Sequence, residues 1–232
     1  MLAAIFCAQP SLAEAATNSS LLPQLTELTR PAKKIPFKEV ILATTGQRIL
    51  DFDTNNPAHA TLHARLTTAA SAATTAARAA GLFASRANEA GNALESFIKA
   101  ALTEAGLDAR TPLTTAGNAR STGYPDLEIH VPVPCYLELK TYSATTANTT
   151  QRSFYYSPSE SPKVTHDALH LLLAYELERT ERVGRTAFIP VRWKLITLQD
   201  LEVDLKFEFN QSNRGLYGRE AGKALLGESA VD

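Results

Sequence analysis

Residues 123–140 read GYPDLEIHVPVPCYLELK, and this stretch decides the fold. On either side of two prolines, apolar residues alternate with polar ones, and this period-two pattern predicts two short strands. The prolines, Pro132 and Pro134, fit the connection between the strands because proline cannot donate to a sheet ladder. We therefore expect an antiparallel pair of strands, with the chain reversing direction between them.

Two carboxylates and one lysine in this stretch are expected to meet at one end of the strand pair. Asp126 begins the first strand, whereas Glu138 and Lys140 lie two positions apart in the second. Alternate residues of a strand share a face, so Glu138 and Lys140 emerge on the same side. Asp126 approaches them from the neighbouring strand. The sequence therefore predicts a cluster of two carboxylates and one ammonium group.

This cluster has the residue types of a metal-dependent site that hydrolyses phosphodiesters. Paired carboxylates bind a hard cation such as Mg²⁺, and Mn²⁺ can take its place. A metal held there contacts a phosphate oxygen and lowers the pKa of a bound water. Lys140 would position the attacking water or stabilise negative charge at phosphorus. The alternative is a surface hairpin with an ordinary Glu–Lys pair, because Pro-Asp followed by Glu-x-Lys is a short pattern.

A helix that precedes the two strands carries a third candidate carboxylate. Apolar residues at helical spacing predict this helix from about Arg86 to Glu104, and Gly106 is expected at its C-terminal cap. Glu95 lies at the flank of the apolar face rather than on the outer side of the helix. A carboxylate at that position can reach along the edge of the core into a cleft.

The helix and the motif together resemble a known enzyme family. The order Pro-Asp, then Glu-x-Lys, is that of the PD-(D/E)xK nucleases. The helix sequence RANEAGNALESFIK at 86–99 is similar to the opening helix of type II restriction endonucleases of the NgoPII kind, in which a Gly-(Asn/Asp)-Ala-Leu-Glu stretch precedes both motifs. The likeness covers residues 86–140, so a DNA sequence preference cannot be carried over from it.

The resemblance implies a function and a role for each candidate residue. By resemblance, Asp126 and Glu138 bind the metal, Lys140 is catalytic, and Glu95 supports the metal or orients Lys140. The implied enzyme is a Mg²⁺-dependent type II restriction endonuclease that acts as a homodimer on double-stranded DNA, since two-fold protein symmetry matches a palindromic site. The alternatives are another nuclease of the same superfamily, in DNA repair or junction resolution, and a DNA-binding module that has lost catalysis.

Composition and charge limit the possible partners. The chain has 232 residues, 44% of them hydrophobic, which is enough for a substantial core. A formal net charge of -1 excludes a uniformly basic surface for non-specific binding of nucleic acid, although it leaves room for a local basic cleft. No uncharged apolar run reaches the ~18 residues of a membrane span. Two distant cysteines, Cys7 and Cys135, argue against a disulfide scaffold and fit a reducing cytoplasm.

The expected fold class is α/β, with a mixed central sheet flanked by helices, as in the restriction-endonuclease core. We expect a single endonuclease domain over 1–232, with its catalytic core at about 86–210 and a helical and strand extension at 1–80. The apolar N-terminus has no basic residue before it and favours a buried helix over a secretory signal. Apolar periodicity predicts further helices at 21–34, 61–80 and 165–178, and strands at 35–43, 46–53, 188–198 and 201–210.

Contacts with DNA are expected from loops and strand ends, where hydroxyl, aromatic, amide and basic side chains serve phosphates and bases. Three segments carry such side chains: the end of the second motif strand, the loop before Thr165, and a stretch near the C-terminus. An ordinary solvated loop is the alternative for each. The candidate residues are Tyr142, Ser143, Arg152, Ser153, Tyr155, Ser157, Lys163, Asn213 and Arg214.

A pair of histidines is a weaker candidate for metal binding. His59 and His63 are four positions apart and share a face of a predicted helix, as zinc ligands can. No third ligand is obvious near them. The pattern therefore favours two solvated histidines over a zinc site.

Overall fold

The structure is a computed structural model. It divides the chain into two units, Ile35–Val203 and a second unit formed by Met1–Lys34 with Asp204–Asp232. The single domain expected over 1–232 stays a prediction, and each unit is considered by itself. Within the second unit, the backbone N–H of Lys34 donates to Asp204 Oδ1 at 3.0 Å. The residues that the structure describes are 27, 30, 32–150 and 153–207.

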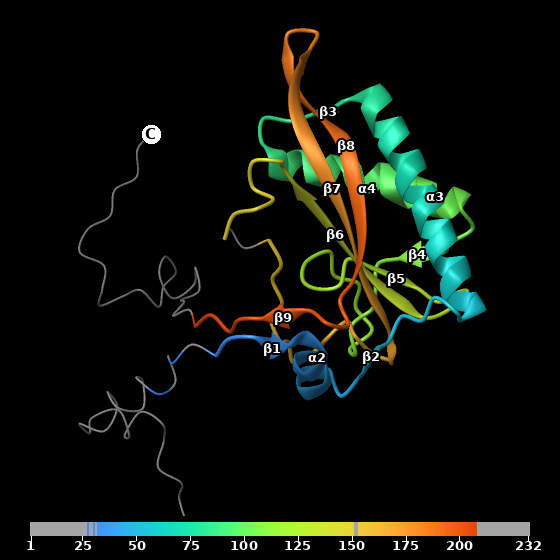
Figure 1. The fold of residues 1–232 in the computed structure, drawn as a ribbon, viewed down its shortest axis with the longest axis vertical. Coiled ribbons are helices and arrows are strands. Elements are labelled where there is room, and N and C mark those ends of the chain that lie inside the picture. Colours follow the sequence, from blue (N-terminus) through green and yellow to red (C-terminus); the bar gives the residue numbers. More distant parts are fainter. Residues whose placement is uncertain (1–26, 28–29, 31, 151–152, 208–232) are drawn as a thin grey trace, which may run out of the picture. The chain divides into compact units, whose positions relative to one another are not determined.

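The unit Ile35–Val203 combines helices with a mixed β-sheet (Figure 1). Its helices are α2 (Phe37–Thr45), α3 (Pro57–Ala80) and α4 (Ala87–Glu104). Its strands are β1 (Ile35–Pro36), β2 (Ile49–Leu50), β3 (Leu82–Phe83), β4 (Ala109–Arg110), β5 (Leu127–Ile129), β6 (Cys135–Tyr142), β7 (Ala168–Arg182), β8 (Arg185–Thr197) and β9 (Glu202–Val203).

Parallel and antiparallel pairs occur in the same seven-stranded sheet. Its order is β3-β8-β7-β6-β5-β4, and β2 pairs with the start of β7. The pairs β6–β7 and β2–β7 are parallel, whereas the other pairs are antiparallel. A separate antiparallel pair joins β1 and β9. This mixed sheet with flanking helices confirms the expected α/β class.

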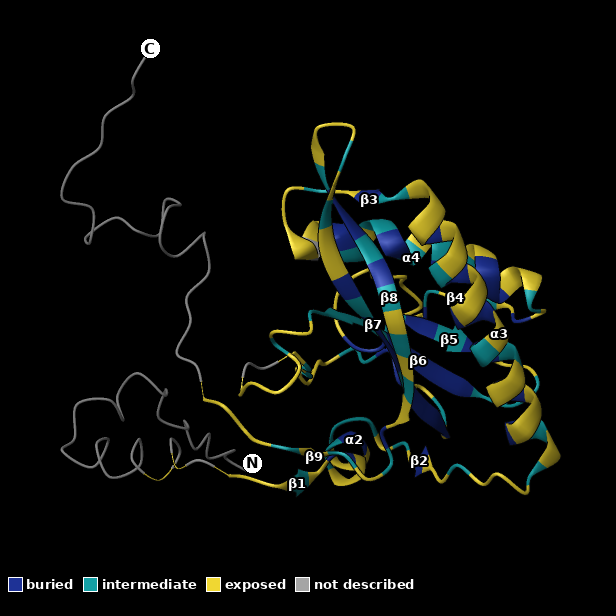
Figure 2. Ribbon diagram, turned by 45° about the horizontal axis from the view of Figure 1, so that its top comes forward, coloured by how far each residue is buried: buried dark blue, intermediate teal, exposed yellow. Residues whose placement is uncertain are grey.

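The two long helices cover one face of the sheet (Figure 1). Buried residues of α3 and α4 form one apolar cluster with buried residues of β5, β6 and β7. Figure 2 shows these strands buried over much of their length, whereas α3 alternates between exposed and buried turns. A second cluster contains residues of α2 with Tyr124, Tyr136 and Val164. The motif strands therefore lie between two apolar layers.

The two helices that precede the motif agree with the prediction. Buried Leu94, Ile98 and Leu102 give α4 its core-facing stripe. The helix ends as expected at Gly106, which has φ 73°, and Leu107 N donates to Leu102 O at 2.9 Å to satisfy an end carbonyl. The alanine-rich α3 begins before the predicted 61, because Asn56 caps it by accepting from Ala58 N at 2.9 Å.

The strand predicted at 35–43 is wrong, because most of this segment forms α2. Phe37 and Ile41 are both fully buried while Glu39 between them is exposed, whereas a strand would place all three on one face. The helix ends at Gly46, whose φ is 75°. The expected hairpin partner at 46–53 reduces to β2, which pairs in parallel with β7.

The helix predicted at 165–178 is also wrong, since β7 occupies Ala168–Arg182. The strand is buried on both faces between β6 and β8, so its apolar residues form a continuous run rather than an alternation. Such a run cannot be told from a buried helix by periodicity alone. The strand predicted at 188–198 is confirmed as β8.

Of the strand predicted at 201–210, the structure forms only β9, and 208–210 lie outside the described residues. Most of the helix predicted at 21–34 and the apolar N-terminus also lie outside them. Among the described helices, none is both long and apolar enough to cross a membrane.

Candidate active site

The strands β5 and β6 bring together the two motif carboxylates. They pair antiparallel, with Leu127 opposite Leu137, as the alternation of the motif predicts. Asp126, at the start of β5, accepts a hydrogen bond through Oδ2 from the backbone N–H of Leu139 at 2.8 Å. Asp126 is thereby fixed to the middle of the Glu-Leu-Lys sequence. Asp126 and the Glu138–Lys140 segment, which are separated in the sequence, therefore lie in one site.

Glu138 is the buried centre of this site. It is 3% exposed, and its Oε1 accepts a hydrogen bond from Lys140 Nζ. Its Oε2 is also buried and has no hydrogen-bond partner among the described residues. Burial, followed by the charge of Asp126, raises the pKa of Glu138 to about 7, against the opposing effect of Lys140. A cation bound at Oε2 would offset both the cost of burying the Glu138 charge and its repulsion from Asp126.

Glu95 of α4 faces the same hollow as the motif residues. This hollow has a volume of about 530 Å³, and its lining includes Glu95, Asp126 and Lys140. Glu95 is half exposed and forms an ion pair with Lys99, with Oε1 2.6 Å from Nζ. The structure thus places all four predicted catalytic residues at or beside one hollow, although the Glu95 carboxylate is held by Lys99.

A glycine allows α4 to lie against the motif strand β6. A Cβ atom added at Gly91 would meet Thr141 Oγ1 at 3.1 Å, tighter than an ordinary van der Waals contact. The absent side chain therefore lets the helix approach β6 where Lys140 and Thr141 line the hollow. This close approach gives a physical reason for the glycine in the Gly-Asn-Ala-Leu-Glu stretch.

Lys163 lies beneath the motif loop rather than on the surface. It is 4% exposed, and its Nζ donates to the carbonyls of Gly123 and Pro125 at 2.6 and 2.7 Å. Burial lowers the pKa of Lys163, while the charges of Asp126 and Glu138 act in the opposite direction. The sequence placed Lys163 among DNA contacts, whereas its bonds in the structure fix the loop that carries Asp126.

A buried tyrosine and histidine support the other side of the loop. Tyr124 Oη and His170 Nδ1 are 2.6 Å apart, and their rings stack. Burial raises the pKa of Tyr124 well above its usual value and lowers the pKa of His170 to about 3. Sequence reasoning missed both residues, because His170 is carried by β7 and is close to the motif only through sheet pairing.

The residues predicted to contact DNA lie in different parts of the structure. Ser153 and Tyr155 line the hollow together with Asp126 and Lys140. Tyr142 lies at the end of β6, with Lys194 Nζ 5.3 Å from its ring centre. The hydroxyl of Ser143 contacts those of nearby threonines in the turn that follows. Arg152, Asn213 and Arg214 lie outside the described residues.

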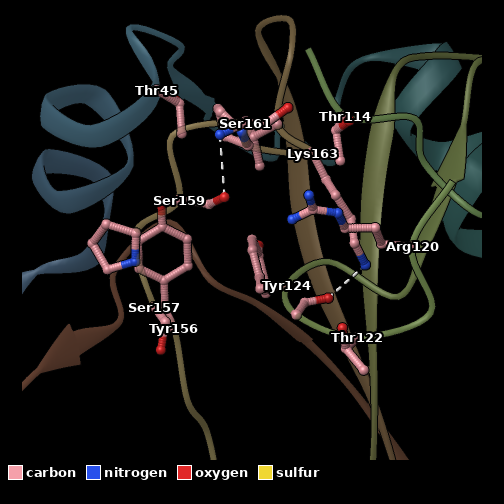
Figure 3. A pocket seen from close by; sticks show the side chains of 14 residues that line it. Thr45, Thr114, Arg120, Thr122, Tyr124, Tyr156, Ser157, Ser159, Ser161 and Lys163 are labelled. Carbon is pink, nitrogen blue, oxygen red and sulfur yellow. Dashed lines mark hydrogen bonds between the residues drawn. The ribbon is translucent and has the colours of Figure 1, made fainter. Parts of the chain in front are cut away.

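Ser157 lines a separate hollow of about 210 Å³ beside the motif loop (Figure 3). Its lining combines several threonine and serine side chains with Arg120 and Lys163. Arg120 belongs to a polar loop without a recognisable motif, so only its positive charge could have marked it as a candidate DNA contact in the sequence. Hydroxyl and guanidinium groups beside the motif loop are suited to contact a phosphate backbone.

The two histidines of α3 differ in their surroundings. His59 is 8% exposed, which contradicts the expected solvated state, and its Nδ1 accepts from Asp53 N at 3.0 Å. Its ring stacks on Phe52. His63 is exposed, as expected. His59 therefore helps fix the turn that leads into α3.

Comparison with known proteins identifies the family. The family model described as "Type II restriction enzyme MjaV family" matches residues 30–220. This chain belongs to the MjaV family of type II restriction enzymes. A relative from Methanocaldococcus jannaschii, named "Type II restriction enzyme MjaV", is 32% identical over 213 residues, which cover 84% of this chain and 90% of the relative. No solved structure matches the chain.

Membership of the MjaV family confirms the predicted enzyme class, a site-specific deoxyribonuclease, and makes DNA the substrate. The matched residues include the helix α4 and both motif strands, so the family likeness spans the hollow described above.

Proposed function

We propose that this MjaV-family chain is a Mg²⁺-dependent endonuclease that hydrolyses phosphodiester bonds in double-stranded DNA at a specific short site. Asp126, Glu138 and Lys140 carry the reaction, and Glu95 supports them. The observation that supports this best is the convergence of two carboxylates and a lysine: Asp126 and Lys140 line the hollow, and buried Glu138 accepts a hydrogen bond from Lys140. The hollow is open to solvent, so a negatively charged phosphate group of DNA can enter it.

The donor set fits a hard divalent cation. Asp126 and Glu138 offer carboxylate oxygens, and Glu138 Oε2 is buried without a hydrogen-bond partner among the described residues. Oxygen ligands of this kind favour Mg²⁺, with Mn²⁺ able to substitute, and Glu95 is the third candidate ligand at the wall of the hollow. The metal would supply charge neutralisation at the phosphate and a lowered pKa of water.

Lys140 is the group of the chain that acts on the reacting phosphate. Its side chain is 27% exposed, and its ammonium reaches Glu138 while lining the hollow. A positive charge placed there holds the attacking water and stabilises the negative charge that develops at phosphorus. The hydrogen bond to Glu138 keeps Lys140 oriented before substrate arrives.

The DNA would enter along the rim that Ser153 and Tyr155 share with the catalytic residues. Hydroxyl groups there suit contacts with phosphate oxygens, which position the duplex without reading its sequence. We further propose a homodimer, because two copies related by two-fold symmetry match a palindromic site and cleave both strands.

The direct test is digestion of plasmid DNA by the purified full-length chain in the presence of Mg²⁺. Discrete fragments that disappear in excess EDTA are expected, and Lys140→Ala should give none. Activity that survives EDTA would exclude the metal-dependent mechanism. A smear without discrete fragments would favour a repair nuclease, and binding without cleavage would favour an inactive DNA-binding module.

A further inference from the structure

Three metal-ligating side chains meet outside the catalytic hollow. Glu128 in β5, His130 just after it, and His166 before β7 place their ligand atoms within 4.8 Å of one another. Glu128 Oε1 lies 2.9 Å from His130 Nε2 and 4.0 Å from His166 Nε2. We propose that these three residues bind a transition-metal ion, Zn²⁺ by preference, at a site distinct from the motif carboxylates.

The hydrogen bonds of His166 leave one ring nitrogen free for a metal. Its Nδ1 lies 3.1 Å from Tyr136 Oη, which also accepts from Thr165 N at 2.9 Å. The tyrosine oxygen has two lone pairs, so it can accept from both groups while its own proton points toward Thr165 Oγ1, 3.4 Å away. Metal binding through Nε2 uses the tautomer with the proton on Nδ1, and the Tyr136 oxygen is placed to accept from it.

In that tautomer, the other nitrogen, His166 Nε2, has an unshared electron pair. It is buried and has no hydrogen-bond partner among the described residues. It is also 4.0 Å from Glu128 Oε1, which is too long for a hydrogen bond. In a metal-binding histidine, the ring N–H opposite the metal usually donates a hydrogen bond to a neighbouring group.

The spacing of the donors fits an ion between them. Zinc binds imidazole nitrogen and carboxylate oxygen at about 2.0–2.2 Å, so two donors on one ion are up to about 4.4 Å apart. The distances of 2.9 and 4.0 Å from Glu128 Oε1 lie inside this limit. The rings of His130 and His166 are neighbours, with centroids 5.6 Å apart.

The donor chemistry separates this site from the catalytic one. Two imidazoles with one carboxylate suit Zn²⁺ and its neighbours, whereas carboxylates with water suit Mg²⁺. Three protein ligands leave a fourth position for water, and His130 is on the exposed rim of the site. An excess of Mg²⁺ is therefore not expected to compete for it.

An ion in this site would join β5 to the segment that leads into β7. That segment also carries Lys163, whose ammonium holds the carbonyls of Gly123 and Pro125. Binding to the folded chain alone raises stability by mass action, so the metal should raise the melting temperature. The proposal does not depend on the catalytic assignment of Lys140 or Glu138.

The test is a titration of the metal-stripped full-length chain with Co²⁺, whose visible absorption band reports four-coordinate binding. One equivalent is expected to bind and to be displaced by Zn²⁺ but not by excess Mg²⁺. Outer-shell changes commonly cost about 10- to 100-fold in metal affinity. His130→Ala and Glu128→Gln, which remove ligands, should cost at least that much, and Tyr136→Phe should fall within that range.

Two controls keep the result interpretable. His63→Ala removes an exposed histidine elsewhere and should leave Co²⁺ binding unchanged. Asp126→Ala should also leave it unchanged, because Asp126 belongs to the catalytic site. His130→Ala alters an exposed side chain and should keep the native circular dichroism spectrum. The absence of a saturable band would overturn the proposal. A band that survives His130→Ala, or one that Asp126→Ala abolishes, would do the same.

Discussion

The carboxylate of Asp126 accepts a hydrogen bond from the backbone N–H of Leu139 at 2.8 Å. This bond ties the first motif residue to the position between Glu138 and Lys140. It also occupies one carboxylate oxygen, Oδ2, and leaves the other for a different partner. Asp126 thus has a structural role besides the proposed chemical one, and two substitutions can separate them.

Asp126→Asn keeps an oxygen that can accept from Leu139 N, whereas Asp126→Ala leaves that N–H without a partner. We expect the alanine variant to lose about 1–3 kcal/mol more free energy of unfolding than the asparagine variant. Both should lose cleavage at least about 100-fold, because neither supplies a negative charge. Urea unfolding and plasmid cleavage measure the two effects. An asparagine variant that cuts at the wild-type rate would contradict the catalytic assignment.

Lys140→Ala should separate cleavage from DNA binding. The lysine is one charge among many contacts, so affinity for DNA should change little, whereas the rate should fall about 10²- to 10³-fold. Binding is measured by mobility shift in Ca²⁺, which we expect to support binding but little cleavage. Lys38→Ala, on the exposed side of α2, is the matched control. Near wild-type cleavage by Lys140→Ala would remove Lys140 from the mechanism.

Glu95→Ala tests whether α4 contributes to the reaction. A bystander on the surface would change stability within about 0.5 kcal/mol and leave activity alone. A residue that supports the metal should cost about 10- to 100-fold at limiting Mg²⁺, and more Mg²⁺ should restore part of the rate. No recovery at high Mg²⁺ would instead indicate that Glu95 orients Lys140. Glu104→Ala, on the exposed end of the same helix, is the control.

Because Glu95 pairs with Lys99, a Lys99 variant gives a second test of the role of Glu95. Lys99→Ala frees the Glu95 carboxylate without removing it. If Glu95 acts on the metal, Lys99→Ala should keep or raise activity, whereas Glu95→Ala lowers it. Unchanged cleavage by both variants at limiting Mg²⁺ would show that the carboxylate has no part in the reaction.

The convergence of Asp126, Glu138 and Lys140 was predictable because it depends on a local rule. Alternate residues share a face of a strand, so Glu138 and Lys140 were bound to emerge together once β6 was recognised. No such rule applies to Lys163 and His170, because they contact the motif loop only in the folded sheet, where β7 lies beside β6. Their positions depend on sheet order, which periodicity in a single segment does not specify.

The errors in secondary structure have the same origin. The apolar run of β7 is long because both faces are buried, and tertiary pairing rather than local pattern makes it a strand. In α2, β-branched residues favoured a strand, but the burial of Phe37 and Ile41 with Glu39 exposed between them fits a helix. By contrast, α4 was correct because its apolar stripe and its Gly106 cap agree.

Lys163→Met distinguishes a positioning residue from a DNA contact. Methionine keeps most of the length of the side chain but cannot donate to Gly123 O and Pro125 O, so two carbonyls lose a partner. We expect a loss of about 1–3 kcal/mol in the free energy of unfolding and a lower cleavage rate. The salt dependence of DNA binding should stay the same, because no phosphate contact is removed.

That salt dependence is the deciding measurement for Lys163. Each phosphate contact contributes about -0.9 to the slope of log affinity against log salt concentration. A slope that becomes shallower by about this amount in Lys163→Met would place the lysine at the DNA instead. Lys38→Met provides the matched loss of an exposed lysine.

His170 predicts a specific dependence of stability on pH. Burial lowers its pKa to about 3, from an ordinary value of 6.5, so the folded chain keeps the ring neutral. Between these values the unfolded chain binds a proton that the folded chain does not. Stability should therefore be complete above about pH 6.5 and fall with decreasing pH by about 1.4 kcal/mol per unit from this residue.

His170→Asn should remove this contribution. The amide can still bond Tyr124 Oη, which the ring contacts at 2.6 Å, but it does not titrate in this range. Carboxylates affect wild type and variant alike, so the difference between their unfolding free energies isolates the histidine. Urea unfolding from pH 7 to pH 4 should show a steeper decline in the wild type, with His63→Ala as the control. Parallel declines in wild type and His170→Asn would mean that His170 is not kept neutral by the fold.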